Sequence, residues 1–333
     1  MIDKKKVKIV GCGLSGITSA IILKEKGYNV KIFEKRSHIG GNCFDSNLCG
    51  TMIHNYGPHI FHTNDEEVFK FLSKYTEWVP FKYQPKGETE LGLISLPYSK
   101  KTIKEIGREL SPDEIKKYLF KDYSEKQWGV SFDKIPKTIT NRIPDTAKME
   151  DPTWFKNDKY QCLPKNGYTK MMGKMLDGID VKLSCTDEDW KKYHADITIY
   201  TGKIDEFYDF KFGRLPYRSL KFKHTVTDEK MSYLVENSNT KKHNYTRKYD
   251  HSYFDLNHNQ DITVVTEEYP VEYNGKNIPF YPIHFGDSGK AASKYIELSK
   301  SENNVIFVGR LATYKYLDMW MAIKQAMLKC KSL

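Results

Sequence analysis

The chain opens with apolar runs separated by a glycine-rich turn. Residues 7–10 form a short β-type run, and an apolar segment at 17–23 follows the turn GCGLSG. Gly27 stands where the end of a helix favours glycine, and a second β-type run follows at 30–33. This pattern predicts a strand, a tight turn, a helix and a second strand, in that order.

The turn has the spacing of a dinucleotide-binding fingerprint. Gly11, Gly13 and Gly16 lie between the predicted strand and helix, and Glu34 follows Gly16 by 18 residues. Glycine lets the backbone approach a pyrophosphate at a helix N-terminus, and an acidic residue at the end of the next strand accepts a hydrogen bond from a ribose hydroxyl. A second glycine turn at 39–42 favours FAD over NAD, because the longer cofactor would require a second close approach; an ordinary loop is the alternative.

The middle of the chain departs from this alternation. Residues 103–127 have a helical pattern, with Ser111-Pro112-Asp113-Glu114 as an N-cap. Residues 138–154 hold two prolines and no apolar period, which predicts a mobile loop. Short β-type runs at 220–222, 262–265 and 280–283 are separated by polar turns. These runs predict an antiparallel sheet.

The C-terminal segment contains a strand pattern followed by a helix pattern. A buried-type strand at 305–308 precedes a predicted helix at 318–329. We expect this end to return to the nucleotide-binding sheet, which gives an α/β fold with a Rossmann-like domain.

Composition restricts the class of protein and its partners. The 333 residues are enough for about two domains, and the net charge of +10 favours acidic partners such as phosphorylated ligands. No long apolar run predicts a membrane span. The basic pairs are scattered, which argues against a nucleic-acid binder. Six cysteines without a CxxC pair fit free thiols in a reducing compartment, so we expect a cytoplasmic protein.

Two further features are open to more than one interpretation. His54, His59 and His62 cluster without a nearby cysteine or carboxylate, so a metal site is disfavoured; they could be core or turn residues, or could tune protonation beside a cofactor. Trp128 could stack on a nucleobase or belong to the core.

A set of motifs along nearly the whole chain resembles one family. YGPHIFHT, YSEKQWG, YRSLKF, VVTEEYP and GRLATYKYLDM occur in this order and together resemble UDP-galactopyranose mutase, a flavoenzyme family. The resemblance implies a discontinuous FAD-binding domain (1–66, 173–213 and 285–333), a small helical insert (99–135) and a twisted antiparallel-sheet substrate domain (67–98, 136–172 and 214–284).

The resemblance also implies an activity. The family interconverts the pyranose and furanose forms of a UDP-hexose, UDP-galactose or a relative such as UDP-N-acetylgalactosamine, through a sugar adduct on N5 of reduced FAD, for cell-surface glycan synthesis. NAD(P)H would serve only as an external reductant, and no metal, nucleic acid or membrane is expected. Hydrolysis of a nucleotide sugar by the same fold, or an FAD-dependent oxidoreductase, are the alternatives.

The resemblance assigns residues position by position. Residues expected to hold FAD are Gly11, Gly13, Gly16, Glu34, Arg36, Gly41, Asn42, His62, Arg310, Asp318 and Met319. Those expected at the substrate are Tyr123, Trp128, Lys148, Tyr160, Arg218, Arg247, Tyr281, Tyr316 and Asp318. The expected catalytic residues are His59, His62, Arg247 and Arg310.

The chain departs from the family pattern in three places. Bacterial mutases carry an arginine four residues after the arginine of an RIP motif; here Arg142 begins that motif and Thr146 stands at the fourth position, while counting back from Tyr160 indicates Lys148. Tyr83 replaces an asparagine expected near the sugar, so the hexose is left open. The shortened helical insert leaves the oligomeric state open between monomer and dimer.

Overall fold

The protein is described by a computed structural model that covers residues 5–140, 146–286 and 288–333. A five-stranded parallel sheet has the order β10–β2–β1–β11–β17. Its strands are β1 (Lys6–Val10), β2 (Asn29–Phe33), β10 (Asp180–Lys182), β11 (Ile197–Tyr200) and β17 (Val305–Phe307). The predicted Rossmann-like core and the return of the C-terminal strand to it are confirmed.

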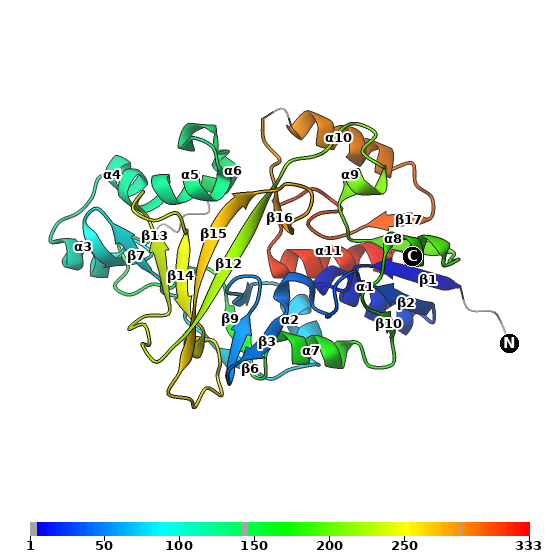
Figure 1. Cartoon of the computed structure of the whole chain (residues 1–333), viewed down its shortest axis with the longest axis horizontal. Helices are drawn as coiled ribbons and strands as arrows, with labels where there is room; N and C mark the ends of the chain where they lie inside the picture. The colour runs from blue at the N-terminus through cyan, green and yellow to red at the C-terminus, as the bar shows by residue number, and fades with distance from the viewer. Residues whose placement is uncertain (1–4, 141–145, 287) are drawn as a thin grey trace.

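Two helices lie beside this sheet. In Figure 1, α1 (Leu14–Glu25) and the red α11 (Met319–Lys331) lie against each other beside the blue strands. All residues of α1 from Leu14 to Leu23 are buried, and they are either apolar or small, with Ser15, Thr18 and Ser19 as the polar members. Because α11 begins beside the start of α1, segments from the N-terminal and C-terminal parts of the chain meet at the predicted nucleotide site.

A seven-stranded sheet has the order β16–β12–β15–β14–β13–β7–β8. It is antiparallel except where β13 pairs with β7. Figure 1 shows long twisted strands β12 and β15 reaching from the sheet toward the nucleotide-binding core. The strands are β7 (Lys86–Thr89), β8 (Gly92–Ser95), β12 (Tyr217–Thr227), β13 (Val235–Ser238), β14 (Arg247–Asp250), β15 (Thr263–Glu272) and β16 (Pro279–Pro282).

The segment predicted to be helical over 103–127 is divided into several helices, and the predicted N-cap at Ser111 is confirmed. α3 (Lys100–Ile106) ends at Gly107, which has φ 84°, and α4 (Pro112–Lys116) begins anew behind a capping box in which Ser111 and Glu114 exchange hydrogen bonds. A π-helical turn at Lys117–Lys121 leads into α5 (Asp122–Trp128). The apolar periodicity survives the break because the pieces pack on one small core.

The remaining elements connect these parts. They are β3 (Asp45–Leu48), β4 (Thr51–His54), β5 (Phe61–Thr63), α2 (Glu66–Ser73), β6 (Trp78–Pro80), α6 (Lys137–Thr140), β9 (Tyr160–Pro164), α7 (Tyr168–Met175), α8 (Asp187–Lys192), α9 (Ile204–Phe207) and α10 (Ser288–Ser299). β5, β9 and β6 form a small separate sheet. The exact boundaries of the three expected domains stay a prediction. Among the described residues, no helix is both long and apolar enough to cross a membrane.

Candidate active site

A large cavity lies where the parallel sheet, the seven-stranded sheet and α5 meet. Its volume is about 1460 Å³, and its wall runs from the glycine turn after β1 to α5 and β16. Single small-molecule sites commonly occupy about 300–1000 Å³, so this space is large enough for a dinucleotide together with a second ligand.

The glycine turn forms one end of the cavity and has no room for side chains. A Cβ on Gly11, at φ +104°, would lie 2.0 Å from Thr201 Oγ1, and a Cβ on Gly16 would lie 2.0 Å from the Gly11 carbonyl oxygen. Gly41 approaches from the second glycine turn, where its Cβ would lie 3.0 Å from Gly13 Cα. No side chain therefore covers the backbone of these glycines at the N-terminus of α1, where the free amide N–H groups favour binding of an anion.

The end of β2 places a carboxylate and a guanidinium beside this turn. Buried Glu34 accepts hydrogen bonds from the backbone N–H groups of Cys12, at 2.7 Å, and Arg36, at 2.8 Å. Arg36 Nη2 donates to Asn42 Oδ1 at 2.9 Å, and its guanidinium lies 4.6 Å from the Tyr56 ring centre. Arg36 Nη1 is buried without a partner, which fits an anionic group in the cavity.

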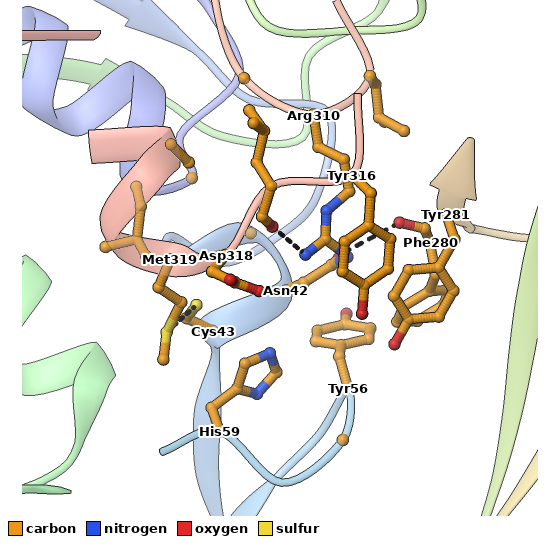
Figure 2. A pocket seen from close by; sticks show the side chains of 18 of the residues that line it. Asn42, Cys43, Tyr56, His59, Phe280, Tyr281, Arg310, Tyr316, Asp318 and Met319 are labelled. Atoms are coloured by element: carbon orange, nitrogen blue, oxygen red, sulfur yellow. Dashed lines mark hydrogen bonds between the residues drawn. The ribbon is translucent and has the colours of Figure 1, made fainter. Parts of the chain in front are cut away.

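Arg310 is oriented by backbone carbonyls and aromatic rings (Figure 2). Its Nη2 donates to the Leu317 carbonyl at 2.6 Å and its Nη1 to the Phe280 carbonyl at 3.1 Å. The guanidinium also lies 5.2 Å and 5.3 Å from the ring centres of Tyr281 and Tyr316. Asp318 is the N-cap of α11, and Met319 follows it, with Sδ 3.6 Å from Cys43 Sγ. A fixed cation with tyrosines on one side is suited to a phosphate.

Trp128 is both buried and part of the cavity wall. It is 5% exposed, and its ring lies 6.1 Å from those of Tyr281 and Tyr316. Tyr123 lies one turn earlier on α5, and burial raises its pKa well above the ordinary value. Trp128 is therefore as buried as a core residue, and it also lies at the cavity, where a nucleobase could stack on it.

Arg247 enters the cavity from β14 already paired. Its Nη2 lies 2.8 Å from both carboxylate oxygens of Glu268, a side chain with no exposed surface. Burial opposes the charge of Arg247, but Glu268 outweighs it, and the pKa of the guanidinium lies well above its ordinary value. The buried Tyr83 side chain is close enough for its hydroxyl to interact with Arg247.

The three clustered histidines have separate environments. His54 Nδ1 accepts from the His59 backbone N–H at 3.1 Å, and burial lowers the pKa of His54 to about 3. His59 lines the cavity, and burial lowers its pKa to about 4, with Arg310 and Arg247 acting in the same direction. His62 also lines the cavity and pairs with Asp158. The described residues contain no group of three or more His, Cys, Asp or Glu side chains placed to hold a metal ion.

Several predicted site residues lie elsewhere. Tyr160 is not part of the cavity wall: its ring stacks on Phe69 at 3.7 Å and its hydroxyl faces Glu66. Phe155 and Trp154 line the wall in its place, because the turn before β9 points back into the cavity.

Four positions from the mobile-loop and substrate predictions lie outside the cavity wall or outside the described residues. Lys148 is exposed and outside the cavity wall, and Thr146 is buried, donating to the Tyr98 carbonyl at 2.7 Å. Arg218 donates to the Gln127 and Lys126 carbonyls, which ties α5 to β12 behind the cavity. Arg142 lies outside the described residues.

Amide side chains that the sequence analysis overlooked line the wall near α5. Gln127, Asn237 and Asn239 each have a buried side-chain oxygen without a partner. Such oxygens can accept from the N–H groups of a nucleobase. Gln127 lies inside the YSEKQWG motif, so a signal existed for it; the two asparagines come from β13 and the turn after it and had none.

Comparison with known proteins agrees with this geometry. A family model described as UDP-galactopyranose mutase matches residues 118–316, and one described as an NAD(P)-binding Rossmann-like domain matches residues 9–75. A probable UDP-galactopyranose mutase from Klebsiella pneumoniae is 34% identical, over 98% of this chain and 94% of its own length. The dTDP-fucopyranose mutase of Escherichia coli is 32% identical, over 98% of each chain.

A solved structure extends the comparison to the fold. The crystal structure of a reduced UDP-galactopyranose mutase superposes with a TM-score of 0.78 at 13% sequence identity, covering 98% of this chain and 93% of that one. The fold, the motifs and the relatives agree over nearly the full length. The chain therefore belongs to the UDP-galactopyranose mutase family of isomerases.

Proposed function

We propose that this protein is an FAD-dependent mutase that interconverts the pyranose and furanose forms of a nucleotide-bound hexose. The observation that carries the proposal is one continuous cavity, which runs from the glycine turn to the aromatic wall at Trp128. A dinucleotide at one end and a sugar nucleotide at the other would meet near Arg310 and His59.

The cofactor end fits FAD through groups of this chain. The bare N-terminus of α1 and the unpartnered Arg36 Nη1 would hold the pyrophosphate, and Glu34 would exchange its backbone donors for ribose hydroxyls. Asn42, Arg310 and the N-terminus of α11 would face the ring system. Reduced FAD, when bound, supplies a nucleophilic N5 for the anomeric carbon of the sugar. NAD(P)H would be needed only to reduce the flavin beforehand.

The substrate end supplies stacking and charge. Trp128 and Tyr123 would pack on the base, and an amide oxygen of Gln127 or Asn237 would accept its single N–H group, N3–H. Arg247 and Arg310 would neutralise the diphosphate as it leaves and returns, so that the nucleotide stays in the cavity between the two bond-forming steps.

The identity of the sugar depends on the wall around Tyr83. Tyr83, Phe155 and Trp154 give this wall an aromatic character, which favours a sugar that presents a deoxy or otherwise apolar edge. The Escherichia coli relative is named for a fucopyranose, a 6-deoxy sugar, carried on dTDP. We therefore propose dTDP-linked or UDP-linked hexoses as the substrate class, with UDP-galactose, UDP-N-acetylgalactosamine and a 6-deoxy sugar as the candidates.

The test is a product assay on the purified, flavin-loaded protein. The enzyme is reduced with dithionite and given each sugar nucleotide, and products are separated by chromatography against the oxidised enzyme. A furanose product formed only with reduced flavin is the expected result. Release of free nucleoside diphosphate and sugar would support hydrolysis instead, and a redox change of the sugar would support an oxidoreductase.

We further propose a cytoplasmic role in cell-surface glycan synthesis.

A further inference from the structure

His62 and Asp158 form a close pair on the cavity wall. His62 lies on β5, and its Nδ1 is 2.5 Å from Asp158 Oδ2, which belongs to the turn before β9. Both residues line the cavity and both side chains are largely buried, at 16% and 23% exposed. The proposed mechanism makes no use of Asp158.

The turn that carries Asp158 is held in place by several contacts. The Asp158 backbone N–H donates to the Phe155 carbonyl at 2.9 Å, and Gln161 Nε2 donates to the carbonyls of both residues. The Phe155 ring lies flat on the His62 imidazole, with centres 3.6 Å apart and planes 8° apart. The stacked Phe155 ring therefore sets the plane of the imidazole, and the contact of Nδ1 with Asp158 sets its rotation within that plane.

The hydrogen-bond chain also determines which ring nitrogen carries the proton. An ionised carboxylate only accepts hydrogen bonds, so His62 Nδ1 must be the donor, and in the neutral ring Nε2 is left with a lone pair. The other Asp158 oxygen, Oδ1, accepts from Asn64 Nδ2 at 3.0 Å. The Asn64 side-chain amide cannot flip by 180°, because its Oδ1 accepts a hydrogen bond from the Lys159 backbone N–H at 2.7 Å.

We propose that Asp158 is a positioning residue, which presents His62 Nε2 to the cavity as a fixed hydrogen-bond acceptor for a hydroxyl or N–H group of the bound substrate. The role of that acceptor in turnover rests on the function proposed above. The tautomer does not, and it can be measured on the protein without substrate.

Asp158→Asn is the discriminating substitution because it keeps the shape and changes the donors. Asn64 Nδ2 keeps one N–H on the Asn157 carbonyl, at 2.8 Å, and directs the other at position 158, so the new amide turns its oxygen to Asn64 and its NH₂ to His62 Nδ1. His62 must then carry its proton on Nε2, and the acceptor is lost. Histidine labelled with ¹⁵N reports this directly, since a protonated ring nitrogen and one with a lone pair have well-separated ¹⁵N shifts; His62→Gln identifies the signal.

Exchanging the two side chains provides the rescue. In the double variant Asn64→Asp with Asp158→Asn, the carboxylate introduced at position 64 accepts from both the Lys159 N–H and the new amide NH₂. The amide oxygen then faces His62 and restores the Nδ1–H form. Near-ultraviolet circular dichroism checks that each variant is folded. A His62 that keeps its proton on Nδ1 in the folded Asp158→Asn variant would overturn the proposal.

Turnover separates this inference from the proposed function. In the reduced, flavin-loaded enzyme, Asp158→Asn should lower kcat/KM about 10²-fold and the exchanged pair should recover most of the loss. A changed tautomer with undiminished turnover would overturn the acceptor role. A changed tautomer in a protein that converts no sugar nucleotide would leave the pair as inferred and count against the mutase function.

Discussion

Arg247 and Glu268 face each other across neighbouring strands and form a bidentate ion pair at the cavity wall. They are register partners on β14 and β15, and Glu268 has no exposed surface. The pair holds a cation in place before any ligand arrives, so the guanidinium does not have to be ordered when an anionic ligand binds.

Glu268→Gln should therefore be strongly destabilising. The change leaves the buried Arg247 charge without its counter-ion, a loss of about 3–5 kcal/mol in the free energy of unfolding. Urea denaturation measures it. Glu267→Gln is the control, because Glu267 points to the other face and pairs with the largely exposed Lys223; it should cost less than about 1 kcal/mol. Equal losses in the two variants would contradict the interpretation.

Gly11→Ala should abolish cofactor binding. Gly11 and Gly92 share a φ near +103°, but a Cβ on Gly11 meets Thr201 Oγ1 at 2.0 Å, whereas a Cβ on Gly92 meets nothing within 4 Å. Gly92→Ala therefore introduces only the backbone strain, a loss of about 1–3 kcal/mol in stability, and serves as the control without a steric clash. The flavin absorbance per mole of purified protein is the measurement. A yellow Gly11→Ala variant would show that the turn can relax.

Trp128→Ala should weaken binding of the nucleotide by about 1–3 kcal/mol, the cost of one lost stack. Because Trp128 is 5% exposed, the free energy of unfolding should fall as well, by about 3–5 kcal/mol. Trp78→Ala is the control: Trp78 stacks on Phe61 outside the cavity wall, so it should affect stability but not UDP affinity measured by calorimetry. The same UDP affinity in both variants would place Trp128 in the core alone.

Lys148→Ala should leave nucleotide affinity within about twofold of the unmodified protein, because Lys148 is exposed and lies outside the cavity wall. Lys156 lines the cavity and serves as the comparison. Lys156→Ala should weaken binding of UDP more than Lys148→Ala does, and more so at low salt. A larger loss for Lys148→Ala would mean that the segment carrying it moves onto the bound nucleotide.

Acid should destabilise the protein as its buried histidines take up protons. Burial lowers the pKa of His54 to about 3 and that of His59 to about 4, and it lowers the pKa of His251 well below the ordinary value. The unfolded chain binds these protons near pH 6.5, so the stability is fully present above that pH. It is lost as the pH falls toward 4, by up to about 1.4 kcal/mol per pH unit for each histidine.

Urea denaturation between pH 7.5 and 4.5 measures this dependence. His251→Asn should flatten it, since the amide oxygen can replace Nδ1 as acceptor for the His54 N–H. His194→Asn is the control, because His194 is exposed and should leave the slope unchanged. A slope that His251→Asn does not alter would assign the acid sensitivity to other groups.

Local patterns predicted the nucleotide-binding half of the fold well. Gly11, Glu34 and the strands around them follow rules of backbone conformation and apolar period that act over a few residues. Over 103–127 the cap at Ser111 could be predicted in the same way, whereas the apolar period alone did not indicate that Gly107 ends a separate helix before it. Gly107 itself was the cue for that helix end.

The substrate end depended on long-range placement. Counting along the chain selected Tyr160, but the turn before β9 brings Phe155 to the wall and leaves Tyr160 against Phe69. The partners Arg247 and Glu268 are set by strand register, and His62 meets Asp158 only because β5 and β9 pair.

The amino-acid sequence by itself determined the family, the nucleotide fingerprint and most of the regular elements, because these depend on contacts between near neighbours and on motifs that can be read in order. Only the tertiary structure decided which side chains share the cavity and that Nδ1 of His62 faces Asp158. Side-chain direction and hydrogen-bond partners are products of packing between distant segments, and no local pattern encodes them.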